Sequence, residues 1–143
     1  MADVQHLAPD HSLHPHEEQP PSPYGRVVQD ELRGPARELR RAIPDVYQGF
    51  AALHSAALTD GALSTKHKEL MAFAISTALR CDGCIASHAR AAVRAGASPA
   101  EAAEAVGVTI LMQGGPSTIY GPRAYAAFME FHAVEAPSTS GAG

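Results

Sequence analysis

The only two cysteines of the chain lie close together, and a histidine follows them. The segment from Cys81 to His88 reads CDGCIASH. In a helix, Cys81, Cys84 and His88 occupy positions i, i+3 and i+7, which fall on one face of about two turns. Two cysteines at this spacing can close a disulfide, and an imidazole four residues after the second can hydrogen-bond its sulfur and favour the thiolate. The segment therefore predicts a redox-active thiol pair with its own base.

Two opposing effects bear on which thiol ionises first. Cys81 lies where a helix would begin, and the unpaired amides and dipole of a helix N-terminus stabilise a thiolate. Asp82 opposes ionisation of its neighbour Cys81, whereas Cys84 has His88 one turn onward to accept its proton. The residues alone leave both assignments open, and we favour Cys84.

Composition limits the class of protein. A chain of 143 residues with 45% hydrophobic content fits one domain, and a formal charge of -4 from 15 acidic and 11 basic residues excludes a broad basic surface for nucleic acid. No apolar run reaches the eighteen or so residues that a membrane helix needs, and the N-terminus lacks the order of a signal peptide. We expect a soluble cytoplasmic protein without nucleic-acid or membrane partners. Cytosolic cysteines stay reduced, so the CxxC spacing suits catalysis or metal better than a structural disulfide.

Abundant alanine and the absence of tryptophan favour closely packed helices over sheets. We expect an all-α fold, a compact bundle of about six or seven helices between residues 25 and 135. Because small residues fill little volume, a second copy could complete the core, and we expect a homo-oligomer.

The ends of the chain differ from its middle. Residues 1–24 are rich in proline and histidine, which neither propagate a helix nor bury a core, and residues 136–143 are small and polar. We expect both segments to be flexible. The irregular spacing of the N-terminal histidines defines no metal geometry. They are His6, His11, His14 and His16.

Local signals place the helices. Gly34-Pro35 predicts a break that divides the region from Gly25 to Ala42 into two short helices. Ser98-Pro99-Ala100-Glu101 has the pattern of a capping box and predicts a helix start. The other expected helices span 45–58, 65–80 after Ser64, 81–95, and 117–134 after Gly114-Gly115-Pro116.

The expected helix 65–80 carries two stripes. The wide apolar face predicted to pack inward consists of Leu70, Met71, Ala74, Ile75, Ala78 and Leu79. A second stripe, with Glu69 on a flank, consists of Glu69, Phe73, Ser76 and Arg80. The preceding helix carries His54, which we interpret as a surface or oligomer-contact residue.

Glu69 can act together with the thiols and His88 only if the two expected helices bring it close to them. On a straight helix it lies about 16 Å before Arg80, whereas His88 is about 10 Å beyond Cys81. The side chains of Glu69 and His88 can meet only if the two helices cross at an angle or the first helix ends early. Taken alone, Glu69 reads as a solvated residue or a salt-bridge partner of Lys66 or Arg80.

A glutamate lies twelve residues before CxxCxxxH, with Ser64-Thr65-Lys66 before this motif and the capping box after it. By this pattern the chain resembles the carboxymuconolactone decarboxylase superfamily, on its alkylhydroperoxidase D-like branch. The resemblance covers about residues 40–135. It implies the all-α fold of that type, homo-oligomers that are often trimers or hexamers, and thiol-dependent reduction of peroxides or disulfides. Asp82-Gly83 departs from relatives that carry a histidine between the cysteines.

The resemblance also implies roles. Cys84 would attack a small-molecule hydroperoxide, Cys81 would resolve the product as a disulfide, and Glu69 with His88 would move protons. No glycine-rich nucleotide motif occurs, so we expect no bound cofactor and an external dithiol reductant protein, lipoyl or thioredoxin-like. The name-giving decarboxylases do not rely on a CxxC pair, which argues against a lactone decarboxylase.

Other readings of the same centre stay open. The chain could be a disulfide reductase that uses no peroxide, or a sensor that keeps the fold and the thiols. It could also be a metal-binding module in which Cys81, Cys84, His88 and Glu69 hold zinc.

Overall fold

The computed structural model describes residues 23–136, which form helices and no strand. The six helices are α1 (Arg26–Ala42), α2 (Pro44–Leu58), α3 (Thr65–Leu79), α4 (Asp82–Arg94), α5 (Pro99–Gln113) and α6 (Gly115–Glu135). The all-α prediction is confirmed. Within this part of the chain, no helix is long and apolar enough to cross a membrane. The predicted N-terminal arm, apart from its last two residues, and the C-terminal tail after Ala136 lie outside the described residues.

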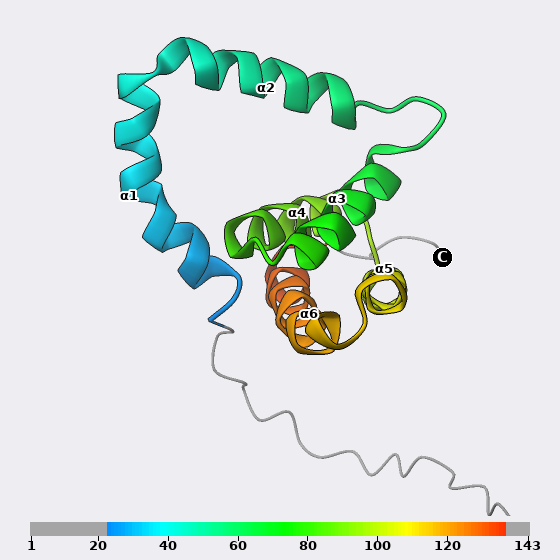
Figure 1. Cartoon of the computed structure of the whole chain (residues 1–143). Helices are drawn as coiled ribbons and strands as arrows, with labels where there is room; N and C mark the ends of the chain where they lie inside the picture. The colour runs from blue at the N-terminus through cyan, green and yellow to red at the C-terminus, as the bar shows by residue number, and fades with distance from the viewer. Residues whose placement is uncertain (1–22, 137–143) are drawn as a thin grey trace, which may run out of the picture.

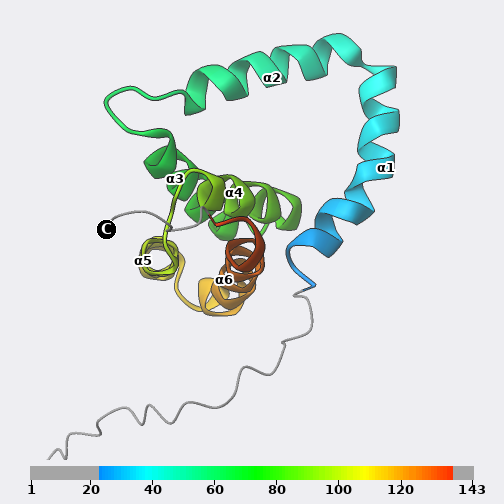
Figure 2. The same ribbon diagram turned by 180° about the vertical axis from the view of Figure 1, so that it is seen from behind.

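Helices α3 to α6 form a bundle, and α1 and α2 extend from it as a bent arm (Figures 1 and 2). The hydrophobic core comes from the bundle, and neither α1 nor α2 contributes a buried residue to it. Alanines allow the helices to approach closely, and a Cβ added at Gly121 of α6 would lie 2.7 Å from Cγ1 of Val106 on α5. The largest side chains at the centre are Phe73, Phe128, Phe131, Ile85 and Val93.

The predicted division of residues 25–42 into two short helices is wrong. Pro35 lies inside one continuous helix, α1. Proline removes the backbone donor for the carbonyl of Glu31, which normally kinks or ends a helix. Here α1 is exposed along most of its length, so water can satisfy that carbonyl and the helix continues.

The inward face of α3 also differs from the prediction. Met71, Ile75 and Leu79 are exposed, at 52, 56 and 72%. The buried residues are Glu69, Leu70, Phe73, Ser76 and Thr77. Phe73 fills the core, and the hydroxyls of Ser76 and Thr77 donate to the carbonyls one turn earlier, so these polar groups are buried with partners. Leu70 is thus the one buried member of the predicted apolar face, whereas Glu69, Phe73 and Ser76 of the second stripe are buried and Arg80 is exposed.

A tight turn joins α3 to α4. Arg80 adopts the left-handed conformation with φ 57°, and the backbone N–H of Cys81 donates to the carbonyl of Ser76 at 3.1 Å. Helix α4 then begins at Asp82, immediately after this turn. The two helices consequently follow each other closely and pack against each other in the bundle.

Side-chain caps fix the starts of α3 and α5. The hydroxyl of Ser64 accepts the N–H of His67 at 3.4 Å. At α5 the predicted capping box is confirmed, since Ser98 Oγ accepts the N–H of Glu101 at 3.2 Å and Glu101 Oε2 accepts the N–H of Ser98 at 2.8 Å.

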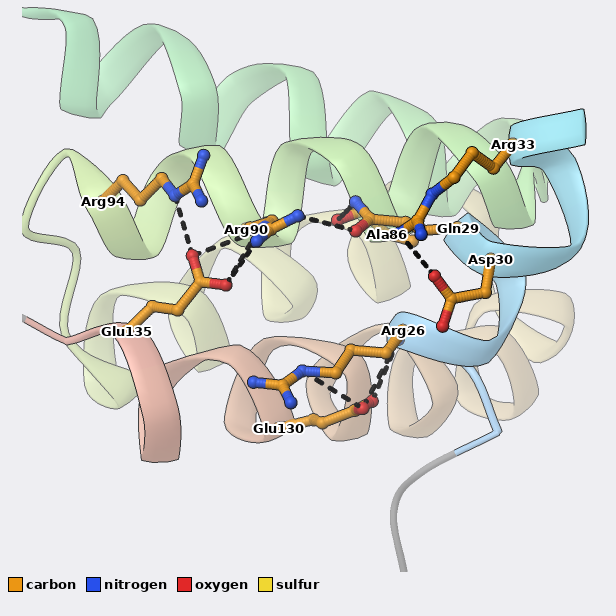
Figure 3. A network of polar contacts seen from close by, with 9 residues as sticks. All are labelled: Arg26, Gln29, Asp30, Arg33, Ala86, Arg90, Arg94, Glu130 and Glu135. Atoms are coloured by element: carbon orange, nitrogen blue, oxygen red, sulfur yellow. Dashed lines mark hydrogen bonds and ion pairs between the residues drawn. The ribbon is translucent and has the colours of Figure 1, made fainter. Parts of the chain in front are cut away.

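A polar network attaches the first half of α1 to α4 and α6 (Figure 3). Glu135 accepts hydrogen bonds from Arg90 at 2.8 Å and from Arg94 at 2.7 Å. These hydrogen bonds, with that from Arg90 the stronger, lower the pKa of the Glu135 carboxyl. Arg90 also donates to Gln29 at 3.2 Å, and Gln29 donates to the carbonyl of Ala86 at 3.4 Å. The network therefore fixes the first half of α1 to the bundle, and α2 takes no part in it.

Candidate active site

The two cysteines lie at the start of α4 and form a disulfide. Cys81 is the N-cap residue and Cys84 lies in the first turn, with their Cα atoms 5.2 Å apart. Cys84 is exposed, whereas Cys81 is half-buried. Cys84 is therefore the more accessible residue of the pair.

Glu69 and His88 are brought together, as the resemblance implied. Oε2 of Glu69 lies 2.8 Å from Nδ1 of His88. Glu69 lies in the second turn of α3 and His88 in the second turn of α4. The Glu69 side chain is only 6% exposed and the His88 side chain 21%. A carboxylate this buried needs a strong partner, and His88 provides it.

The contact with Glu69 determines which nitrogen of His88 remains available. With Nδ1 engaged by the carboxylate, Nε2 is left for a reacting group. In the disulfide form described for residues 23–136, no hydrogen bond joins His88 to either sulfur. The predicted contact between Cys84 and His88 is thus not formed in this oxidised structure, although the two residues are four apart on one helix.

Lys66 does not pair with Glu69, which was the alternative interpretation of that carboxylate. Its ammonium lies 2.6 Å from Oε1 of Glu101 on α5. The hydrogen bond from Lys66, followed by that from the backbone of Ser98, lowers the pKa of Glu101 to about 2. Because this ion pair attaches the first turn of α3 to α5, it supports the segment from which Glu69 points toward His88.

His54 is the residue that sequence reasoning missed. Its ring stacks on that of His88, with centroids 6.1 Å apart and planes inclined by 16°. Phe50, one turn earlier on α2, lies 6.3 Å from His54 between ring centroids. His54 is exposed, as expected, but its position on α2 places it next to His88, in the centre formed by the cysteine pair, Glu69 and His88. The two histidines are 34 residues apart in the sequence, and no sequence pattern signals this contact, which depends on the path of α2 over the bundle.

The zinc interpretation finds no support in the geometry. Among residues 23–136, no group of three or more histidine, cysteine or acidic side chains is placed to hold a metal ion. The two cysteines bind each other, and Glu69 binds His88.

Comparisons with known proteins identify the family to which the chain belongs. The model of the carboxymuconolactone decarboxylase family matches residues 44–128, a span that contains the disulfide, Glu69 and His88. The chain belongs to the carboxymuconolactone decarboxylase family. A crystal structure of a carboxymuconolactone decarboxylase family protein from Legionella pneumophila is similar, with a TM-score of 0.72 and 36% identity over 75% of this chain and 96% of that one.

Two curated relatives resemble the same region. An uncharacterised protein of Cupriavidus necator is 36% identical over 90 residues, which cover 63% of this chain and 80% of the relative. An uncharacterised protein of the cox locus in Paracoccus denitrificans is 32% identical over 93 residues, which cover 65% of this chain and 84% of the relative. For this member of the carboxymuconolactone decarboxylase family, the activity must therefore be argued from the site.

Proposed function

We propose that this protein is a thiol-dependent oxidoreductase of the alkylhydroperoxidase D-like branch, which reduces hydroperoxides through Cys84 and Cys81. The observation that carries the proposal is an exposed Cys84, bonded to Cys81, on the helix whose His88 is held by a buried carboxylate. Low thiol pKa values and accessibility are what distinguish reactive cysteines from structural ones.

The first step consumes the peroxide. In the reduced protein, His88 accepts the proton of Cys84, and the thiolate attacks the terminal oxygen of the hydroperoxide. The O–O bond breaks, Cys84 becomes a sulfenic acid, and the alkoxide takes the proton back from His88 and leaves as the alcohol. Glu69 stabilises the protonated imidazole between these two transfers and keeps Nε2 of His88 available to them.

The second step closes the disulfide. The thiol of Cys81 attacks the sulfur of the Cys84 sulfenic acid, an S–S bond forms, the S–O bond breaks, and the hydroxide leaves as water with the proton of Cys81. An external dithiol, lipoyl or thioredoxin-like, then supplies two electrons and two protons and becomes a disulfide itself. The exposed sulfur of Cys84 is the one that such a partner reaches.

Disulfide exchange without peroxide is a second candidate. It is favoured by the same exposed Cys84, because a protein thiol can attack an accessible disulfide directly. This function would be supported if a dithiol partner reduced the Cys81–Cys84 disulfide rapidly while the protein reduced peroxide no faster than a free thiol does.

We also propose that the protein is a homo-oligomer, a trimer or hexamer. Large apolar side chains are exposed on several helices, which is unusual for a monomer. They include Val46, Leu53, Met71, Ile75, Leu79, Leu111 and Met112. Light scattering after size-exclusion chromatography tests this, and a mass equal to the 15.0 kDa chain would contradict it.

Single-turnover chemistry tests the peroxidase directly. Reduced Cys81→Ser treated with cumene hydroperoxide should form a sulfenic acid that dimedone traps on Cys84, and Cys84→Ser should form none. His88→Gln should slow the wild-type reaction, whereas the matched change His132→Gln on α6 should not. If dimedone instead traps a sulfenic acid in Cys84→Ser and none in Cys81→Ser, then Cys81 attacks the peroxide and Cys84 resolves the product. A wild-type protein that oxidises no faster than free cysteine refutes the peroxidase.

A further inference from the structure

A groove next to the proposed centre runs along one face of α2. Its residues come from the end of α1 and from α2, and most are apolar or aromatic. Pro44, Tyr47, Ala51 and His54 recur at i, i+3, i+7 and i+10, so they follow one side of the helix. The lining consists of Arg40, Pro44, Tyr47, Gln48, Phe50, Ala51 and His54.

A positive charge marks one end of the groove. The guanidinium of Arg40 lies over the ring of Tyr47, 5.4 Å from its centroid. Among the ion pairs of residues 23–136, none involves Arg40. Arginine in this situation is suited to a planar anion such as a carboxylate, with an apolar body lying against the neighbouring aromatic ring.

The other end of the groove meets the proposed centre. His54 lines the groove and its ring also stacks on His88, which Glu69 holds. Seven residues separate Tyr47 from His54, which is about 10 Å along the helix. A chain-like molecule with its charged end at Arg40 would thus direct its far end toward His88.

This face of α2 is distinct from the apolar row assigned to subunit contacts. Val46 and Leu53 are each 65% exposed and do not line the groove. Phe50, at 62% exposed, lies on the boundary between the two faces. A second copy can therefore cover the outer row without occupying the groove.

We propose that this groove binds the organic substrate and selects fatty-acid hydroperoxides, with the carboxylate at Arg40, the apolar chain along Tyr47 and Ala51, and the hydroperoxide near His88. The proposal rests on the function proposed above and specifies its substrate class. Three observations support it: a cation without an acidic partner, an apolar floor, and a shared histidine that connects the floor to the catalytic imidazole.

Binding is tested without turnover. The disulfide form of the full chain is titrated by calorimetry with decanoate and with decyltrimethylammonium, each below its micelle concentration. We expect decanoate to bind at least tenfold more tightly, and Arg40→Gln to weaken decanoate about tenfold. Arg37→Gln, an exposed residue one turn earlier on α1 that does not line the groove, should leave decanoate binding unchanged. Equal affinity for both amphiphiles, no binding, or equal effects of the two arginine changes would overturn the proposal.

Kinetics separates this inference from the proposed function. Arg40→Gln should raise the KM for a fatty-acid hydroperoxide about tenfold more than the KM for tert-butyl hydroperoxide. Equal losses for both substrates would overturn the groove while leaving the peroxidase intact. If wild-type protein reduces neither hydroperoxide, the peroxidase fails, and the decanoate titration still decides whether the groove is a carboxylate site.

The groove is also tested against occupation by a second copy. Ala51→Phe places a bulky ring on the groove floor and should abolish decanoate binding at an unchanged molar mass in light scattering. A change in that mass would show that the face is a contact between copies, which overturns the proposal.

Discussion

Replacing Glu69 with glutamine removes a single buried charge and keeps the shape of the side chain. In the structure, Oε2 of Glu69 is 2.8 Å from Nδ1 of His88, and the carboxylate side chain is 6% exposed. Glutamine can still accept a hydrogen bond from the imidazole, so the ring can keep its position. What Glu69→Gln removes is the negative charge that stabilises His88 when it carries the proton of Cys84.

The expected effect follows from the strength of this contact. A hydrogen bond to a charged group contributes about 1.5–3 kcal/mol, against about 1 kcal/mol for a neutral one. The remaining difference of about 0.5–2 kcal/mol corresponds to a factor of about 2–30. Because both groups are largely shielded from solvent, salt should change this factor little.

The assay is the rate at which iodoacetamide alkylates Cys84 in the reduced protein at pH 7. It reports thiolate without assuming any peroxide chemistry. Glu69→Gln should slow alkylation about 2- to 30-fold, and single-turnover oxidation by cumene hydroperoxide should slow by a similar factor. Glu104→Gln, an exposed carboxylate on α5, makes the same change in net charge and should have no effect.

A double-mutant cycle decides whether the two residues act together. If Glu69 acts through His88, then Glu69→Gln in a His88→Gln background should cause little further loss. Additive losses would refute the relay, as would a Glu69→Gln protein that alkylates at the wild-type rate. Thermal unfolding within a few degrees of wild type excludes misfolding as the cause of a slow rate.

Three further predictions concern stability. Lys66→Met should lower the free energy of unfolding at pH 7 by about 1 kcal/mol. The lowering of the Glu101 pKa from 4.5 to about 2 would alone correspond to about 3 kcal/mol. The expected effect is smaller because the two side chains are about one-third exposed and solvent screens their attraction. Because the folded-state pKa of Glu101 is lowered, this stability is present above about pH 4.5 and is lost as pH falls toward 2, as thermal unfolding across that range will show. Gly121→Ala should cost about 1–3 kcal/mol in urea unfolding through its clash with Val106, whereas Gly107→Ala, in open space on α5, should cost nothing. Glu135→Gln should accelerate proteolytic cleavage within α1 by releasing its anchor.

Each of these predictions has a contrary result. A Lys66→Met difference that persists unchanged at pH 2 would mean that the lysine stabilises α3 by some means other than Glu101. Equal stability of the Gly121→Ala and Gly107→Ala proteins would show that α5 and α6 can separate without cost. A protease pattern for Glu135→Gln identical to wild type would show that the other contacts of α1, which include those of Arg26 with Glu130 and of Gln29 with Ala86, hold it without Glu135.

Local signals explain most of what could be predicted from sequence. Ser64 and Ser98 fix helix starts because their hydroxyls satisfy orphan N–H groups within three residues, a short-range effect that is visible in the pattern. The family motif likewise identified Glu69 and His88 before any geometry was known. Their proximity was uncertain on straight helices, and the structure shows the two side chains in contact.

The failures involve tertiary context. Pro35 predicts a break only where its carbonyl partner is hidden from water, and α1 is exposed there. On α3, apolar side chains surround much of the helix, so periodicity alone could not decide between Met71 and Phe73 as the inward residue. The contact of His54 with His88 depends on where the arm lies in space, which no pattern within α2 encodes.

Helix α2 contributes no buried residue, so changes in its sequence are largely separated from the folding of the bundle. Substitutions that would be purged from a core for lost stability are tolerated here, and selection is free to act on them for other reasons. Since α2 also brings His54 against His88, it is a segment in which evolution or an engineer could alter chemical preference while the thiols and the base that serves them stay unchanged. A library that randomises Tyr47 and Ala51 would therefore be expected to retain mostly folded members.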